Sequence, residues 1–174
     1  GQVIFGLCRA FRETEDERYL RGATAAGDWL LSIQDPEGSW TRGLSSMSNN
    51  PVHTYNVRVA WALAELARVT LQERFEQAAE RNVEWCLTQQ QGNGWFENVA
   101  PNRDTWPITH FIAYTIRGVL ECGRALHRDD FVDGASRAVR GLLANERDGY
   151  LPAQLDREWR PIDGSCCLTG SSQT

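Results

Sequence analysis

The chain repeats itself at an interval of 56 residues, and this repeat restricts the possible folds more than any other feature of the sequence. The interval separates Tyr19 from Phe75, and Phe75 from Phe131. Further positions match in all three copies: Ala23, Ala79 and Ala135; Gly27, Val83 and Val139; Leu30, Cys86 and Leu142; Leu31, Leu87 and Leu143. Within one copy these positions are three or four residues apart, which is the spacing of one face of an amphipathic helix. Each copy therefore contains a helix with one buried face.

A second helix precedes this one in every copy. The same register continues upstream through two sets of residues: Leu7, Leu63 and Val119, and Ile4, Ala60 and Ile116. Short polar segments join the two helices, whereas long segments join one copy to the next, and strand signals are weak throughout. The sequence thus predicts a single all-α domain of three antiparallel helical hairpins, an α/α toroid segment. We place the repeats at about 1–54, 55–109 and 110–168, with the start of a further helix at 169–174.

Each hairpin is followed by a glycine and an aromatic residue. The pairs are Gly38 with Trp40, Gly94 with Trp95, and Gly149 with Tyr150. Glycine is favoured where a helix ends or a chain turns tightly, because it reaches positive φ without steric cost. We therefore expect these glycines to adopt positive φ.

The stretch "WLLSIQDPEGSW" at 29–40 resembles the QW repeat of the terpenoid cyclase and protein prenyltransferase superfamily, whose members are α/α toroids. Matching residues occur in all three copies: Trp29, Leu30, Gln34, Gly38 and Trp40; then Arg81, Trp85, Gln90 and Gly94; then Arg137, Ala138 and Leu142. The resemblance implies that the glutamine hydrogen-bonds terminal backbone groups of a neighbouring helix while the tryptophan stacks against it. A complete ring of this kind has six hairpins. We therefore expect the chain to be half of a longer protein, or to close a ring as a homodimer.

The sequence departs from the chemistry of that superfamily in two places. Squalene-type cyclases carry an Asp-x-Asp-Asp proton donor, whereas "HRDD" at 127–130 falls in a short turn at the wrong end. Prenyltransferase β subunits hold zinc with Asp, Cys and His, and no such set is apparent, so we expect no metal and no cofactor.

The stretches "YNVRVAWALAEL" and "FIAYTIRGVLE" are similar to bacterial toroid proteins found with genes for cell-surface polysaccharide biosynthesis. Uronyl hydrolases, sugar epimerases and polysaccharide lyases share the α/α barrel.

Charge and hydropathy exclude several kinds of partner. The net charge is −5 at pH 7 and there is no basic run, so we expect neither nucleic acid nor an anionic membrane as partner. No stretch has the apolar length needed to cross a bilayer. The five cysteines are odd in number and three lie in helical patterns, which favours reduced, buried thiols in a cytoplasmic protein.

The first helix of each hairpin also carries a stripe of polar and aromatic residues beside its core face. The register aligns Gln2, Arg58 and Tyr114, then Phe5, Trp61 and Arg117, and it places His110 one turn before Tyr114. In a toroid the first helices form the inner ring, so this stripe is expected to face the lumen. Sugars suit such a surface, because a sugar ring stacks on Trp or Tyr while Arg and His bond its hydroxyls and carboxylates. We expect five substrate-binding residues: Arg58, Trp61, Trp106, Tyr114 and Arg117.

Five residues near the long loops are candidates for acid–base chemistry: His53, Tyr55, Asp104, His110 and Asp163. A glycosidase would pair Asp104 with Asp163, and a lyase would use His53 or Tyr55 as its base. In a lyase, Arg58 or Arg117 would neutralise the uronate. Structural roles compete with these assignments: His53 as a helix cap, His110 as a structural histidine, Asp104 at a helix N-terminus, Trp61 and Trp106 in the core, and ion pairs of Arg58 with Glu65 and of Arg117 with Glu121.

The sequence therefore predicts a protein that binds or processes a sugar or oligosaccharide in a concave polar face. If it is an enzyme, the expected classes are hydrolase, lyase and epimerase. Two alternatives remain open, an isoprenoid enzyme and a non-catalytic helical scaffold.

Overall fold

The computed structural model describes residues 1–43 and 45–173, and in that part of the chain the protein is built from helices. Three hairpins follow one another: α1 (Gln2–Thr14) with α2 (Glu17–Ile33), α3 (Val57–Thr70) with α4 (Glu73–Thr88), and α5 (Thr109–Leu126) with α6 (Asp129–Leu143). The 3₁₀ helix η1 (Thr54–Asn56) leads into α3, and α7 (Leu168–Ser171) is the short last helix. Among the described residues β pairing is limited to isolated bridges. The predicted all-α fold of three hairpins is confirmed; Thr174, at the end of the predicted further helix, lies outside the described residues.

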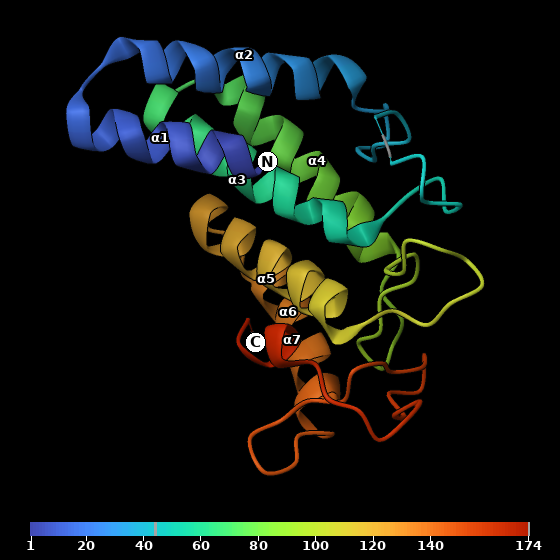
Figure 1. Ribbon diagram of the computed structural model, residues 1–174. Helices are drawn as coiled ribbons and strands as arrows, with labels where there is room; N and C mark the ends of the chain where they lie inside the picture. The colour runs from blue at the N-terminus through green and yellow to red at the C-terminus, as the bar shows by residue number, and fades with distance from the viewer. Residues whose placement is uncertain (44, 174) are drawn as a thin grey trace.

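The hairpins lie side by side in two layers (Figure 1). Helix α3 packs between α1 and α5 to form an inner row, and α2, α4 and α6 each pack on the inner helix of their own hairpin. The short turns lie at one end of the helices and the long loops at the other (Figure 1). A single apolar core runs through all three hairpins. The inner row therefore presents one continuous face, formed by α1, α3 and α5.

The three short turns share one geometry. Each inner helix ends in a left-handed residue, and these residues are again 56 apart: Glu15 (φ 57°), Leu71 (φ 57°) and His127 (φ 55°). The N–H of each bonds the carbonyl oxygen four residues earlier, on Phe11, Ala67 and Gly123. A left-handed residue at this point satisfies a terminal carbonyl and reverses the chain. His127 is therefore a turn residue, far from the long loops.

The glycines that follow the outer helices have positive φ, as the sequence predicts. The angles are 101° for Gly38, 88° for Gly94 and 82° for Gly149. Gly38 and Gly94 also lie directly against the backbone of the next hairpin, at Arg81 and Arg137 respectively. Gly149 has no such neighbour. The first two glycines are therefore needed both for their φ angle and for a close approach between hairpins.

A glutamine joins each of the first two hairpins to the one that follows it. Nε2 of Gln34 donates to the backbone oxygens of Gly38 (3.1 Å) and Ala78 (2.9 Å), and its Oε1 accepts from Arg81 (3.0 Å). We call this glutamine and arginine, with the backbone they bind, a clasp. The second clasp has the equivalent members 56 residues later: Gln90, Gly94, Gly134 and Arg137.

The clasp corrects one expectation about the helix ends. Ala78 lies inside α4, so Gln34 reaches an interior carbonyl rather than a terminal backbone group. A carbonyl oxygen has two lone pairs, and one stays open to a side chain after the helical bond has formed. The terminal group is satisfied by the tryptophan instead, since Nε1 of Trp40 donates to the oxygen of Leu30 in its own hairpin (3.0 Å).

Candidate functional site

The inner helices bring residues of equal register into contact with one another. Tyr55 stacks on Phe111 with ring centroids 4.8 Å apart, and the guanidinium of Arg58 lies 4.0 Å from the ring centroid of Tyr114. The members of each pair are 56 residues apart. The next turn of the helices repeats the pattern with Phe5, Trp61 and Arg117. We call this series of cross-helix contacts the ladder.

Arg58 and Tyr114 form the second layer of the ladder, one turn further from the long loops than Tyr55 and Phe111. The side-chain amide of Gln2 is assigned the orientation in which its oxygen, rather than its nitrogen, faces Arg58. In this orientation the oxygen accepts from Nε (2.6 Å) and Nη2 (3.1 Å) of the guanidinium. The ring of His110 lies 4.0 Å from that of Tyr114. In the part of the chain that the structure describes, no carboxylate lies within ion-pair distance of Arg58; the predicted partner Glu65 binds other arginines. The positive charge of Arg58 is therefore held by neutral groups and is available to a ligand.

His110 is neutral beside this arginine. Burial, and then the positive charge of Arg58, lower the pKa of His110 below its usual value. Its Nδ1 atom is buried and has no hydrogen-bond partner among the described residues. A neutral imidazole with an unoccupied nitrogen is able to accept a proton from a bound molecule.

The next layer combines aromatic and charged side chains. Phe5 meets Trp61 edge-on with centroids 4.6 Å apart, and the guanidinium of Arg117 lies 5.5 Å from the Trp61 centroid. Nε of Arg117 is also 3.7 Å from a carboxylate oxygen of Glu121, so this suggested ion pair is present. Trp61 is half-buried and packs against the core.

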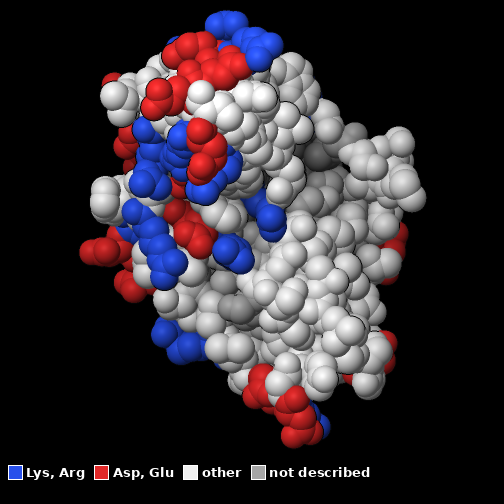
Figure 2. All heavy atoms as spheres, turned by 60° about the vertical axis from the view of Figure 1, so that its left-hand side comes forward, with Lys and Arg blue, Asp and Glu red and all other residues white. Residues whose placement is uncertain are grey.

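Ion pairs fill the short-turn end of the inner face. Glu65 accepts from Arg12 of α1 (3.1 Å) and from Arg68 of its own helix (3.0 Å). Figure 2 shows positive and negative side chains mixed over the short-turn side of the molecule, while much of the remaining face is uncharged. Charges are therefore mutually neutralised at this end, and the unpaired charge of Arg58 lies towards the long loops.

His53 and Tyr55 extend the aromatic contacts into the first long loop. The His53 ring stacks on Tyr55 at 4.7 Å, and Tyr55 stacks in turn on Phe111. His53 is only 2% exposed, and its Nε2 lies 2.8 Å from Oγ of Ser48. Its side chain makes no capping bond to the 3₁₀ helix that follows. Burial lowers the pKa of His53 and raises the pKa of Tyr55, so both side chains are neutral at pH 7.

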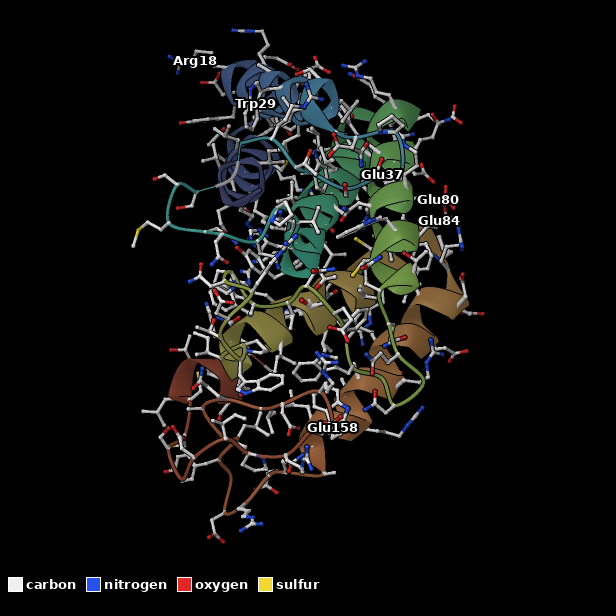
Figure 3. The ribbon with its side chains drawn as sticks, turned by 90° about the vertical axis from the view of Figure 1, so that its right-hand side faces the viewer. Arg18, Trp29, Glu37, Glu80, Glu84 and Glu158 are labelled. Atoms are coloured by element: carbon white, nitrogen blue, oxygen red, sulfur yellow. The ribbon has the colours of Figure 1, made fainter. Side chains whose placement is uncertain are left out.

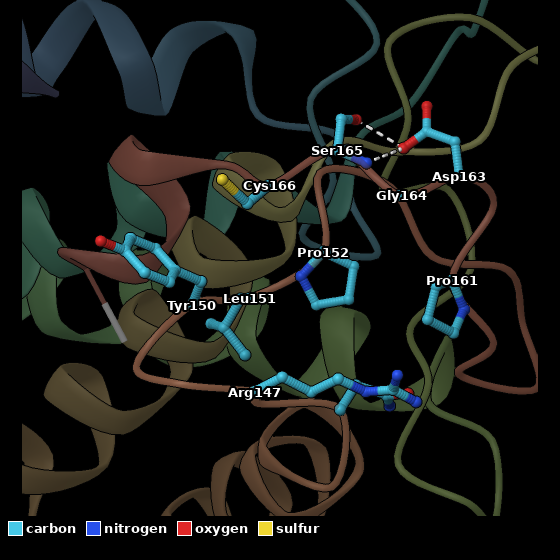
Figure 4. A pocket seen from close by; sticks show the side chains of 10 residues that line it. Arg147, Tyr150, Leu151, Pro152, Pro161, Asp163, Gly164, Ser165 and Cys166 are labelled. Atoms are coloured by element: carbon cyan, nitrogen blue, oxygen red, sulfur yellow. Dashed lines mark hydrogen bonds between the residues drawn. The ribbon is translucent and has the colours of Figure 1, made fainter.

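The remaining candidates lie on the long loops, bonded to different partners. Oδ2 of Asp104 accepts from Asn49 (3.2 Å). Asp163 accepts from the backbone N–H of Ser165 (2.9 Å) and from its hydroxyl, and these bonds lower the pKa of Asp163. Asp163 lines a cavity of about 390 Å³ in the third long loop, and Asp104 is not among the residues lining that cavity (Figure 4). Trp106 is 41% exposed and so lies outside the core.

Several residues of the inner face were not among the predicted site residues. They are Gln2, Phe5 and Phe111. The 56-residue register carries the signal for all three, because each occupies the position of a predicted residue in a neighbouring hairpin. Extending every predicted site residue to its equivalents would have found them.

The remaining sequence features have plain structural counterparts. All five cysteines are free, and Cys8, Cys86 and Cys122 are buried, which raises the pKa of their thiols. The described residues contain no group of three or more His, Cys, Asp or Glu side chains arranged to hold a metal ion. Within the same residues, no helix has the length and apolar character needed to span a membrane.

Helical hairpins in two layers, with a ladder of side chains on the inner face, define a segment of an α/α-toroid domain. Residues 1–127 match the family model of the squalene-hopene cyclase C-terminal domain, and the chain belongs to this family. A comparison with curated protein sequences gave no match.

Solved structures of low sequence identity share the fold. Lin0763 from Listeria innocua is 18% identical with a TM-score of 0.71, covering 98% of this chain and 50% of that one. A possible member of the GH105 family from Salmonella enterica serovar Paratyphi A is 13% identical with a TM-score of 0.71, covering 98% and 51%. Unsaturated glucuronyl hydrolase from Bacillus sp. GL1 is 21% identical with a TM-score of 0.63, covering 87% and 45%. The chain thus spans about half the length of these structures.

Proposed function

We propose that the inner face binds a carbohydrate at the long-loop end of the ladder, with Arg58 as its main polar anchor. The observation that carries the proposal is the unpaired guanidinium of Arg58, fixed between Gln2 and the ring of Tyr114. A guanidinium held in this way donates several hydrogen bonds in a fixed geometry, which suits carboxylates and vicinal hydroxyls. Tyr114 and Trp61 supply aromatic surface for a sugar ring.

The similar structures support the same class of ligand. One is named as a possible member of a glycoside hydrolase family and another as a glucuronyl hydrolase. For a catalytic reaction we assign proton transfer to His110, which is neutral and has an unoccupied buried nitrogen beside Tyr114. The reaction classes that fit a single neutral base at an anionic sugar are lyase and epimerase.

Replacing Arg58 tests the anchor. Arg58→Met keeps the packing of the stem and removes the charge, so we expect it to weaken the binding of D-glucuronate or its oligomers at least about tenfold, since a bond to a charged group contributes about 1.5–3 kcal/mol. Isothermal titration calorimetry measures the affinity. Arg68→Met is the matched control, because Arg68 lies on the same helix but is already paired with Glu65. Equal affinities of the two variants, or no sugar binding by the unaltered protein, would contradict the proposal.

An isoprenoid enzyme is the second candidate, favoured by the family match over residues 1–127. Along the inner stripe the carboxylates are Glu65 and Glu121, and both are paired with arginines. A proton donor for a hydrocarbon would need an unpaired acid. A rise in melting temperature with geranylgeranyl diphosphate, and none with sugars, would favour this candidate.

We further propose that two copies of the chain close one ring. At the outer edges the clasp positions are filled by Glu146 in place of glutamine and by Ala25 in place of arginine. We expect light scattering to give about twice the mass of the 19.6 kDa chain. The double variant Glu146→Gln with Ala25→Arg installs a clasp at the seam, and it should dimerise at lower concentration than either single variant. If the unaltered protein and the double variant are both monomers, ring closure by two copies is contradicted.

A further inference from the structure

A separate cavity lies beneath the first long loop. Its volume is about 250 Å³, it is open to solvent on one side, and it is lined by Gly1, the last turns of α2, the first long loop and the start of α3. Trp29, Trp40 and Tyr55 give it aromatic walls, while His53 and Arg42 supply polar groups. Trp29 lies at the end of the molecule that the first hairpin forms (Figure 3). Cavities for drug-sized ligands measure roughly 300–1,000 Å³, so this one suits a single small ring.

The hydrogen bonds of His53 determine which of its nitrogens carries the proton. Its Nε2 contacts Oγ of Ser48, and the same hydroxyl group lies within hydrogen-bond distance of two backbone oxygens, those of Pro101 and Asn50, to either of which it can donate its single hydrogen. With its hydrogen donated to one of these carbonyls, the serine oxygen accepts from the histidine, and we assign the ring proton to Nε2 on this basis. Because burial keeps His53 neutral, its Nδ1 is an unprotonated acceptor. Nδ1 is buried and has no partner among the described residues.

The unsatisfied acceptor restricts the chemistry of an occupant. A buried acceptor without a partner destabilises the protein, and only a donor from outside can satisfy it. A carboxylate would place its lone pairs against that of Nδ1, whereas a hydroxyl group would donate to it. Arg42 donates to the oxygen of Ser32 (3.4 Å), and its positive charge is one of the causes, after the hydrogen bonds from Thr41 and Ser39, that lower the pKa of Asp35. An occupant with hydroxyl groups as both donors and acceptors fits both side chains.

We propose that this cavity is a second sugar subsite, in which one pyranose ring lies against Trp29 and donates a hydroxyl to Nδ1 of His53. The choice of ligand class rests on the proposed function, but the residues are different. Tyr55 connects the two sites, because it lines the cavity and stacks on Phe111 of the ladder. A chain of linked sugars bound at Arg58 would then continue into this cavity.

The three histidines allow the two sites to be tested separately in one sample. The protein is labelled with ¹⁵N in its histidine rings and titrated with D-glucose, D-mannose and D-glucuronate, with His→Gln variants used for assignment. We expect a sugar to shift the Nδ1 resonance of His53, while His127 in its short turn stays unchanged. A shift at His110 alone would overturn this inference and leave the proposed function standing. A shift at His53 alone would support the subsite and contradict sugar binding at Arg58. No shift at either histidine would overturn both proposals.

Trp29 provides the second measurement. Trp29→Ala should weaken sugar binding about tenfold, as expected for the loss of one aromatic platform. Trp85→Ala is the matched control, because Trp85 is the equivalent residue of the second hairpin and does not line this cavity. Binding by Trp29→Ala that equals binding by the unaltered protein would overturn the subsite, whatever Arg58→Met does.

Discussion

Gly38→Ala is expected to lower the free energy of unfolding by about 3–5 kcal/mol. The residue has φ 101°, which an alanine adopts only with strain. An added Cβ would also lie 2.5 Å from the carbonyl carbon of Arg81 in the next hairpin. That neighbour is backbone inside α4, so it cannot rotate away as a flexible side chain would. The two hairpins must separate, or the turn must distort.

Gly149→Ala is the matched control for that variant. Its φ of 82° imposes similar strain, but no atom lies within 4 Å of the position of an added Cβ. We expect a loss of only about 1–2 kcal/mol, due to the left-handed conformation alone. Urea unfolding followed by circular dichroism measures both variants. If both variants lost the same free energy of unfolding, the close approach of the hairpins would contribute nothing to the effect of Gly38→Ala.

Phe75→Ala is expected to cost about 3–5 kcal/mol of unfolding free energy. Phe75 is fully buried at the start of α4, and its ring fills the space that Gly27 leaves on α2. A Cβ on Gly27 would lie 2.7 Å from the ring atom Cε1. Truncation therefore opens a cavity between two hairpins, where neither helix can move in without disturbing the other.

Tyr19→Ala separates the effect of burial from the effect of the position in the repeat. Tyr19 occupies the same position of the first hairpin, but it is 36% exposed, because no described hairpin packs on that side. We expect it to cost less than about 1.5 kcal/mol. If Tyr19→Ala and Phe75→Ala destabilised the protein equally in urea, the core would not be continuous between hairpins as described.

The fold could be predicted because every hairpin repeats the same physical requirements. Tyr19, Phe75 and Phe131 mark one apolar face, and a face that recurs at helical spacing in all copies leaves little choice of secondary structure. The positive φ of Gly38 followed from the same repetition. The clasp was only partly predicted, since the resemblance named Gln34 but not the interior carbonyl that it binds.

The candidate site likewise contains a part on the helices that the repeat predicts and a part on the loops that it does not. The contact of Arg58 with Tyr114 lies on regular helices, so the register places the two residues at equivalent positions of adjacent helices. The partner of His53 could not be predicted, because Ser48 lies in a long loop whose sequence does not recur, and the residue 56 positions later is Asp104. Loop paths depend on local turns and on the neighbouring loops, and a repeat carries no information about them.

The clasps have a direction, because the glutamine always comes from the earlier hairpin and the arginine from the later one. A hairpin with this glutamine and a following hairpin with this arginine are therefore joined by the same atoms, and the middle hairpin carries both residues, Gln90 and Arg81. A gene that duplicated or lost the middle 56-residue segment would therefore encode hairpins that can still form the same clasps. The number of hairpins in such a protein then follows from the number of segments in its gene, and changing that number requires recombination of whole segments rather than a point mutation.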